Sequence, residues 1–400
     1  MKKVLIALFS FVSIMMFASE LNVLYMNQAG YSPKEMRTIV KEFEEKTNSK
    51  VKITYAPYED MHKNILKSAV SKTPIYDVVL EDLIWTAEFA EKGYVMSIDD
   101  RLTKEMNSDI SSAILDAFRY NDKLWAMPFV VNFQVFFYND EILKKAGIEN
   151  YPTTIEEMTK QMKIIKEKKL VEYPWSDSWN EAEGLVCEYV WLTAAFGGDT
   201  FDKNSKAIFN EGGGLKALEY MKMLLDEGLA NPKSLDMNED MTRDSFVKGE
   251  TVFNSNWPYQ YVKMQENKIG KMATLPVSES VKDKYDTVTV SGYQGIAIMN
   301  NSKNKDLAWE YVKFVTSPEI QKRNTNELPI WNTLLKGEEI KNNIDNIDTR
   351  AKALSHSHHR PRVPEYTKIS KIMQFYIHKA LKGELEPKDA LDKAVAEINK

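Results

Sequence analysis

Two adjacent carboxylates, Glu81 and Asp82, form the first pair of residues along this chain whose types suggest chemistry. Hydrolysis of a glycosidic bond needs two acidic side chains that flank the bond. Both residues follow the run Asp77-Val-Val-Leu80, whose last three residues are apolar and which predicts a β-strand. Neighbouring residues of a strand point to opposite faces, so these two carboxylates are not expected to flank one bond. The pair therefore argues against catalysis, and no catalytic residue is assigned.

Polar and aromatic residues follow the first and third predicted strands. The first three strands are expected at 22–26, 51–55 and 77–80, and a helical pattern follows each of them. Alternating strands and helices predict a mostly parallel sheet with right-handed crossovers. Ligands bind such sheets outside the carboxyl ends of the strands. The candidate ligand-binding residues at these ends are Asn27, Gln28, Tyr31, Glu81, Asp82 and Trp85.

The 8 Trp and 19 Tyr of the chain must be divided between the core and a binding cleft. Trp191 and Trp309 lie in apolar helical patterns and are assigned to the core. Trp257 follows a predicted strand and precedes a proline, which favours a position in a cleft. Trp175, Trp179 and Trp331 fit either environment. Of these three, Trp175 and Trp331 are retained as candidates for the cleft.

Three histidines, His356, His358 and His359, lie close enough in the sequence to suggest a metal site. No cysteine or carboxylate with the spacing of metal ligands accompanies them. A solvated loop is therefore the favoured interpretation, and neither a metal nor a cofactor is expected.

The stretch at 121–140 is predicted to carry the chain from one domain to another. A short strand at 124–127 is expected to end at Pro128, which cannot donate a backbone hydrogen bond. The next run, 130–138, is rich in β-branched and aromatic residues and favours a buried strand, although Asn132 interrupts it with an amide. These features fit a crossing past a binding cleft. An ordinary core hairpin explains the same residues equally well.

The totals favour a globular protein of two domains, because 400 residues exceed what one core usually holds. A net charge of −5 argues against a nucleic-acid partner, which would require a basic face. Two lysines, an apolar run at 4–17 and small residues after it predict a secretory signal peptide at 1–19. A retained membrane anchor is the rival interpretation, but the run is short for a span.

Cys187 is the only cysteine. It allows no intrachain disulfide, and no cysteine stands at the expected cleavage site to carry a lipid. A binding protein without an anchor needs an outer barrier to retain it, so the expected location is the periplasm.

Five segments resemble the sequence pattern of the extracellular sugar-binding proteins of ABC importers. The longest, 291–321, contains Gly-Ile-Ala-Ile, Ser-Lys-Asn-Lys, Ala-Trp-Glu-Tyr and Ser-Pro-Glu in the family's order. The other four are Tyr76-Asp-Val-Val-Leu-Glu-Asp with Gly93, Leu124-Trp-Ala-Met-Pro-Phe129, Phe246-Val-Lys-Gly-Glu250 with Asn256-Trp-Pro-Tyr259, and Arg360-Pro361 with Tyr366. Together with the signal pattern, the resemblance covers essentially the whole chain.

The resemblance implies an α/β protein with the periplasmic-binding-protein type II fold, in which hinge crossovers join two lobes and the ligand lies between them. On this chain the first lobe would comprise residues 20–127 plus 295–330. The second lobe would comprise 133–290 plus 331–400. The hinges would lie near 128–132 and 291–295.

The resemblance also implies ligand contacts, position by position. The matching residues are Asp82, Asn132, Asn256, Trp257, Tyr259, Gly292, Tyr293 and Arg360. Three positions depart from the trehalose- and maltose-binding branch: Val130 replaces a tyrosine, Asn132 an aspartate and Tyr293 a tryptophan. The resemblance therefore does not specify trehalose or maltose as the ligand.

The expected function is that of a monomeric periplasmic protein that captures a mono- or oligosaccharide and delivers it to the permease subunits of an ABC transporter. A protein of the same fold that binds another polar solute is the alternative, for instance a polyol, a sugar phosphate or an oligopeptide. An exported glycosidase is the least favoured interpretation.

Overall fold

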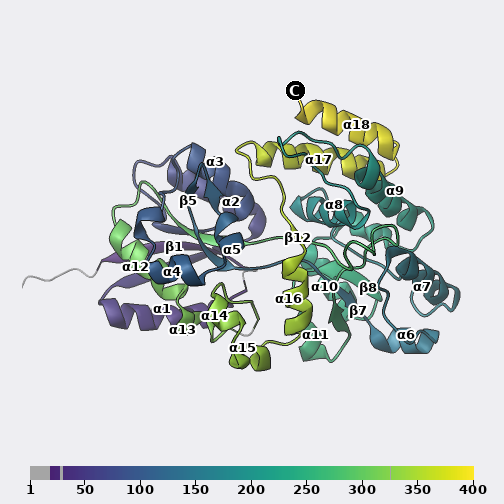
Figure 1. Ribbon diagram of the computed structural model, residues 1–400, viewed down its shortest axis with the longest axis horizontal. Coiled ribbons are helices and arrows are strands. Elements are labelled where there is room, and N and C mark those ends of the chain that lie inside the picture. The colour runs from purple at the N-terminus through teal and green to yellow at the C-terminus, as the bar shows by residue number, and fades with distance from the viewer. Residues whose placement is uncertain (1–18, 28–29, 325) are drawn as a thin grey trace, which may run out of the picture.

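The computed structural model describes residues 19–27, 30–324 and 326–400, which fold into two α/β lobes that lie side by side (Figure 1). The expected signal peptide, apart from Ser19, and the candidate residue Gln28 lie outside the described residues. Among the described residues, no helix has the length and apolar character needed to cross a membrane.

The first lobe is built on a five-stranded sheet with the strand order β2-β1-β3-β11-β6. Its strands are β1 (Glu20–Met26), β2 (Lys50–Ala56), β3 (Val78–Asp82), β6 (Met127–Val130) and β11 (Gln294–Ile298). The first three strands are parallel, as the sequence predicted, whereas β11 runs antiparallel to β3 and β6. A late segment of the chain thus completes the sheet between two early ones.

Helices cover both faces of this sheet, with α2 and α3 above it and α1 below it in Figure 1. The helices of this lobe are α1 (Pro33–Thr47), α2 (Tyr58–Ala69), α3 (Thr86–Glu91), α4 (Lys104–Asp109), α5 (Ser112–Asp116), α12 (Lys305–Val315) and α13 (Pro318–Gln321). A short hairpin of β4 (Arg119–Tyr120) and β5 (Lys123–Leu124) accompanies them. The first helix begins with a capping box, in which the Glu35 N–H donates to Ser32 Oγ and the Ser32 N–H donates to Glu35 Oε2.

The second lobe contains a smaller antiparallel sheet with the order β8-β7-β9. Its strands are β7 (Val135–Tyr138), β8 (Phe253–Asn256) and β9 (Lys271–Ala273), and nearby β10 (Thr289–Val290) pairs with β12 (Ser357–His358). Its helices are α6 (Asp140–Ala146), α7 (Ile155–Glu167), α8 (Glu183–Ala195), α9 (Gly212–Asp226), α10 (Glu239–Val247), α11 (Gln260–Asn267), α17 (Tyr366–Leu381) and α18 (Pro387–Ile398). Almost every residue of α8 is buried, because α9 and α17 pack against it.

Three short helices, α14 (Asn332–Leu335), α15 (Glu338–Asn343) and α16 (Ile347–Ser355), connect the lobes and cover a separate apolar cluster that includes Phe133, Phe137 and Leu328. The sequence assigned residues from 331 onward to the second lobe. Trp331 instead lies in the core of the first lobe, where its indole N–H donates to the Thr316 carbonyl at 2.8 Å. Trp331 therefore packs with the first lobe, and its buried indole N–H has the acceptor that it needs there.

Two crossing segments connect the sheets and are bonded to each other. One leads from β6 to β7 through 131–134, and the other from β10 to β11 through 291–293. The Gly292 N–H donates to the Asn132 carbonyl at 2.9 Å, and Phe133 forms an antiparallel bridge with Ser291. Pro128 was expected to end the preceding strand, but it lies within β6. Because β6 is an edge strand, a residue without a backbone N–H is tolerated there.

The second lobe contains a buried polar cluster centred on Asp177 and Glu188. Ser255 Oγ donates to Asp177 Oδ2 at 2.7 Å and is also hydrogen-bonded to Glu188, to which the Gln134 amide donates as well. Burial raises the pKa of Asp177 to about 7 and raises that of Glu188. The two carboxyls therefore share a site that favours a proton near neutral pH.

Candidate ligand-binding cleft

A small cavity of about 80 Å³ lies between the two lobes. The first lobe contributes Met26, Tyr58, Glu59, Asp82 and Gln294. The second contributes Glu183, Gly184, Cys187, Glu239, Trp257 and Tyr259. The connecting segments contribute Asn132, Gly292 and Arg360. Aromatic rings, carboxyls and amides thus converge on one enclosed space.

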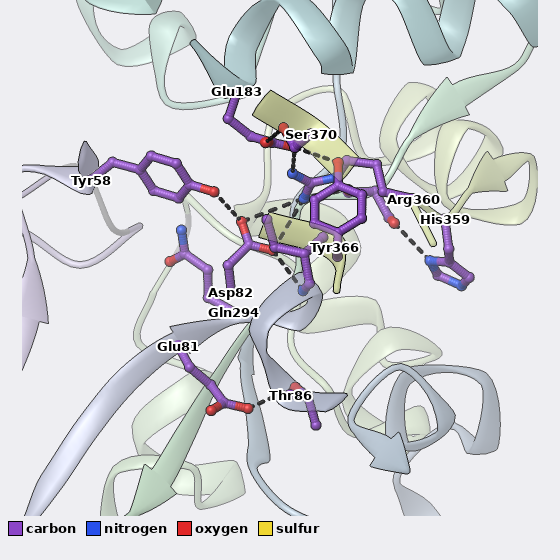
Figure 2. Close-up of polar contacts among 12 residues, drawn as sticks. Tyr58, Glu81, Asp82, Thr86, Glu183, Gln294, His359, Arg360, Tyr366 and Ser370 are labelled. Carbon is purple, nitrogen blue, oxygen red and sulfur yellow. Dashed lines mark hydrogen bonds and ion pairs between the residues drawn. The ribbon is translucent and has the colours of Figure 1, made fainter. Parts of the chain in front are cut away.

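At the floor of the cavity, the guanidinium of Arg360 joins a carboxylate from each lobe (Figure 2). Its Nη2 donates to Asp82 Oδ1 at 3.1 Å, and its Nη1 donates to Glu183 Oε1 at 2.8 Å. The Arg360 side chain is 1% exposed. Burial alone would lower its pKa, but the two carboxylates outweigh burial and the pKa is raised. The arginine is therefore a permanent cation that links the lobes.

Local structure fixes both carboxylates. Asp82 ends β3 and accepts from the Ile84 N–H at 3.2 Å, while the hydroxyl of Tyr58, the first residue of α2, donates to its Oδ2 at 2.9 Å. Glu183 is the first residue of α8, where the helix dipole stabilises a negative charge. The hydroxyls of Tyr366 and Ser370 donate to it from α17. The two carboxylates are thus held by residues at one strand end and three helix starts.

The aromatic wall of the cavity follows β8. Trp257 packs against Gly292, where an added Cβ would lie 2.6 Å from two atoms of the indole ring. Glycine at this position therefore lets the crossing segment approach the ring. The neighbouring Tyr259 donates its hydroxyl to Asp240 at 3.0 Å, which leaves its ring beside the cavity.

Six of the residues proposed from the sequence line this cavity: Asp82, Asn132, Trp257, Tyr259, Gly292 and Arg360. Sequence reasoning missed Tyr58, Glu183 and Glu239, which are the first residues of α2, α8 and α10. Their sequence positions indicate the start of a helix but do not indicate contact with a ligand. Gln294 and Glu59 were also missed.

Three aromatic candidates lie in the cores instead. Tyr31 stacks on Phe129 with ring centroids 4.5 Å apart, and Trp175 lies beside Phe136 with centroids 6.3 Å apart. Trp331, as described above, is buried in the first lobe. These residues are too deeply packed to reach the cleft, and their local sequence does not distinguish a buried ring from a cleft-lining one.

The other candidates support the cavity or lie outside it. Glu81 points away from Asp82 and accepts from Thr86 Oγ1 at 2.7 Å, while burial raises its pKa to about 8 (Figure 2). Trp85 packs behind Tyr58, and Tyr293 shares a hydrogen bond with Ser357 on the other side of its crossing segment.

Asn256 orients the aromatic wall from behind. Its Oδ1 accepts from the Trp257 N–H at 2.8 Å, and its Nδ2 donates to the Glu239 carbonyl at 2.9 Å. The exposed Asn27 does not line the cavity.

The histidines take part in the connecting segments. His359 Nδ1 shares a 2.6 Å hydrogen bond with Ser291 Oγ, and burial lowers the pKa of this ring to about 4. Over the part of the chain that the structure describes, no group of three or more His, Cys, Asp or Glu side chains is placed to hold a metal ion.

Two α/β lobes with a cavity of polar and aromatic side chains between them are typical of a two-lobed binding protein. The chain belongs to the family of bacterial extracellular solute-binding proteins, whose pattern matches residues 29–322. Among curated relatives, a probable ABC transporter-binding protein of Deinococcus radiodurans is 26% identical over 314 residues, 74% of this chain and 72% of the relative. The diacetylchitobiose binding protein DasA of Streptomyces coelicolor is 25% identical over 387 residues, 93% of this chain and 87% of the relative.

Solved structures share the whole fold. Maltose-bound T. maritima MalE3 superposes with a TM-score of 0.86 at 21% identity, covering 95% of this chain and 99% of that one. An ABC transporter solute binding protein of Thermotoga lettingae bound with alpha-D-tagatose gives 0.86 at 22% identity, covering 96% and 99%. The expected fold class is therefore confirmed.

Proposed function

We propose that this protein captures a carbohydrate outside the cytoplasm and delivers it to the permease subunits of an ABC importer. The observation that carries the proposal is the cavity between the lobes, where the Trp257 and Tyr259 rings face carboxyl, amide and guanidinium groups. Relatives whose names specify a maltotriose-binding and a diacetylchitobiose binding protein support the choice of a sugar.

The chemistry of the cavity suits a sugar ring. A pyranose has C–H faces, which aromatic rings cover through dispersion and apolar burial, and a rim of hydroxyls. Carboxylates and arginine form the stronger hydrogen bonds to hydroxyls because they are charged. Asp82, Asn132 and Arg360 would take the hydroxyl rim, and Trp257 would cover one face.

Capture would proceed by rotation of the lobes about the two crossing segments, 131–134 and 291–293. These segments are hydrogen-bonded to each other, so they would bend together. Small-angle scattering should show a smaller radius of gyration when the protein is saturated with its sugar. An unchanged radius with a proven ligand would contradict this motion.

We further propose that the protein is exported and acts as a monomer. The lysines and apolar run at the N-terminus would direct export, with cleavage near Ala18 or Ser19. The mature protein would be a periplasmic monomer without a lipid anchor, and it would bind and release its solute unchanged.

A thermal-shift screen tests the function directly, because a ligand that binds only the folded state raises its stability. The screen would contain mono- and oligosaccharides, polyols, sugar phosphates and oligopeptides. A shift with sugars, followed by calorimetric titration of a 1:1 complex, is the expected result. Shifts confined to the non-carbohydrate solutes would refute the proposal, and turnover of chromogenic glycosides would indicate an enzyme.

A further inference from the structure

The cavity contains more carboxyls than its single cation can neutralise. Four acidic residues line it, Glu59, Asp82, Glu183 and Glu239, against one arginine. Arg360 is already paired with Asp82 and Glu183. Glu59 and Glu239 form no ion pair within the described ranges of the chain. Two negative charges therefore face the cavity without a basic partner.

Of these two residues, Glu239 is the more closely packed. It is the first residue of α10, and its Oε1 approaches Gly184, where an added Cβ would lie 2.8 Å away. Burial raises the pKa of Glu239, and the charge of Glu59 raises it further. A desolvated carboxyl of this kind gains most from a cation that enters the site.

A second observation, independent of the acidic residues, is the amide of Gln294. This residue is 8% exposed, lines the cavity from β11 and lies beside Asp82 in Figure 2. Its Nε2 contacts Met26 Sδ at 3.7 Å, but its Oε1 has no hydrogen-bond partner. A buried acceptor without a donor costs free energy until a ligand supplies one. The cavity thus presents an unused acceptor as well as unused negative charge.

The aromatic side chains fit the same kind of ligand. Tyr58, Trp257 and Tyr259 place three rings around the cavity. The faces of such rings attract cations as well as the C–H faces of sugars. Acceptors, negative charge and ring faces together favour a donor-rich ligand that carries a positive charge.

We propose that the solute bears a protonated amino group, as an amino sugar does, and that Glu239, assisted by Glu59, binds this ammonium. The inference rests on the proposed carbohydrate function and specifies its substrate class. The sugar ring lies against Trp257, and Gln294 Oε1 accepts a hydrogen bond from the same ligand. A neutral sugar would leave Glu239 without a counter-charge.

Calorimetric titration with three disaccharides of the same β-1,4 skeleton tests the inference: chitobiose with free amino groups, N,N′-diacetylchitobiose, and cellobiose. Glucosamine, N-acetylglucosamine and glucose form the matching monosaccharide set. Charged hydrogen bonds predict that the free amine binds about 10- to 100-fold more tightly than its neutral counterparts.

Two variants assign the effect to the carboxyls. Glu239→Gln should reduce the preference for the amine to within about threefold, and Glu59→Gln should reduce it less, because an exposed charge is screened. Glu59 lies at the surface, so its variant is informative even if the substitution at Glu239 prevents folding. Glu167→Gln, an exposed residue of α7 with the same change of charge, should keep the full preference.

Each outcome is decisive. Neutral sugars that bind as tightly as their amines would overturn the inference and leave the carbohydrate function intact. A preference for the amine that persists in both cavity variants would also overturn the role of these carboxyls. Failure of every sugar in both sets, and of all others in the screen, would refute the proposed function and this inference with it.

Discussion

Replacement of Arg360 by alanine should strongly destabilise the folded protein even without ligand, because the residue also forms a buried ion pair with each lobe. The guanidinium is 1% exposed and lies between Asp82, 6% exposed, and Glu183, 13% exposed. Its removal leaves two carboxylates in a poorly solvated site without their cation. Breaking a buried pair in this way costs about 3–5 kcal/mol. The midpoint of urea unfolding, followed by circular dichroism, should fall accordingly.

The chain provides a matched control. Arg323 also joins two carboxylates, Glu42 at 2.7 Å and Glu319 at 2.8 Å, but it is 45% exposed. Surface pairs contribute about 0–1 kcal/mol, so Arg323→Ala should change the midpoint little. A second test combines Arg360→Met with Asp82→Asn and Glu183→Gln, which removes all three charges and should recover much of the lost stability.

Unfolding of Arg360→Ala at the same urea concentration as the wild type or Arg323→Ala would contradict this prediction. An uncharged triple variant that is no more stable than Arg360→Ala would contradict it as well. Either result would mean that the two carboxylates find water or other partners once the arginine is gone.

Three further predictions concern the aromatic wall and the buried acids. Trp257→Ala should weaken binding of the identified ligand by about one to three powers of ten in calorimetric titrations, whereas the core variant Trp309→Phe should lose stability at unchanged affinity. Gly292→Ala should also weaken binding while the protein stays folded, because its Cβ displaces the indole; unaltered affinity would contradict the observed packing. Burial raises the pKa of Asp177 from 3.8 to about 7, so the folded state holds a proton that the unfolded chain releases. The free energy of unfolding should therefore fall as pH rises from about 4 to about 7, and it should fall less in Asp177→Asn. Equal pH dependence of this free energy in both proteins, measured by urea unfolding, would refute the prediction. His359, whose pKa is lowered to about 4, has the opposite effect on stability below pH 6.5.

The first lobe was largely predictable, because its signals are local. The three parallel strands, the capping box of α1 and the helix at 305–315 all follow from periodicity and end signals. The place of β11 between β3 and β6 does not, since the partners are some two hundred residues apart and the strand is antiparallel. The family resemblance assigned residues 295–330 to the first lobe but did not specify the place of this strand in the sheet.

The candidate site was predicted in part for a similar reason. Asp82 and Trp257 follow strands, where ligand contacts are expected, and both line the cavity. Glu183 and Glu239 begin helices, a position that usually reflects capping and the helix dipole alone. Only the packing of α8 and α10 beside β8 brings their carboxyls to the cavity. Trp175 shows the converse, because the same residue type in a loop became core.

Neither lobe is a continuous piece of the chain, and this has a consequence for the order of folding. The sheet of the first lobe lacks its fourth strand until residues 294–298 have been made, and α8 remains uncovered until α17 arrives at 366–381. A nascent chain of fewer than about three hundred residues thus has no complete hydrophobic core, and pairings between such distant segments form slowly. If the protein is exported as proposed, this delay keeps the growing chain loosely structured until almost all of it is available for translocation.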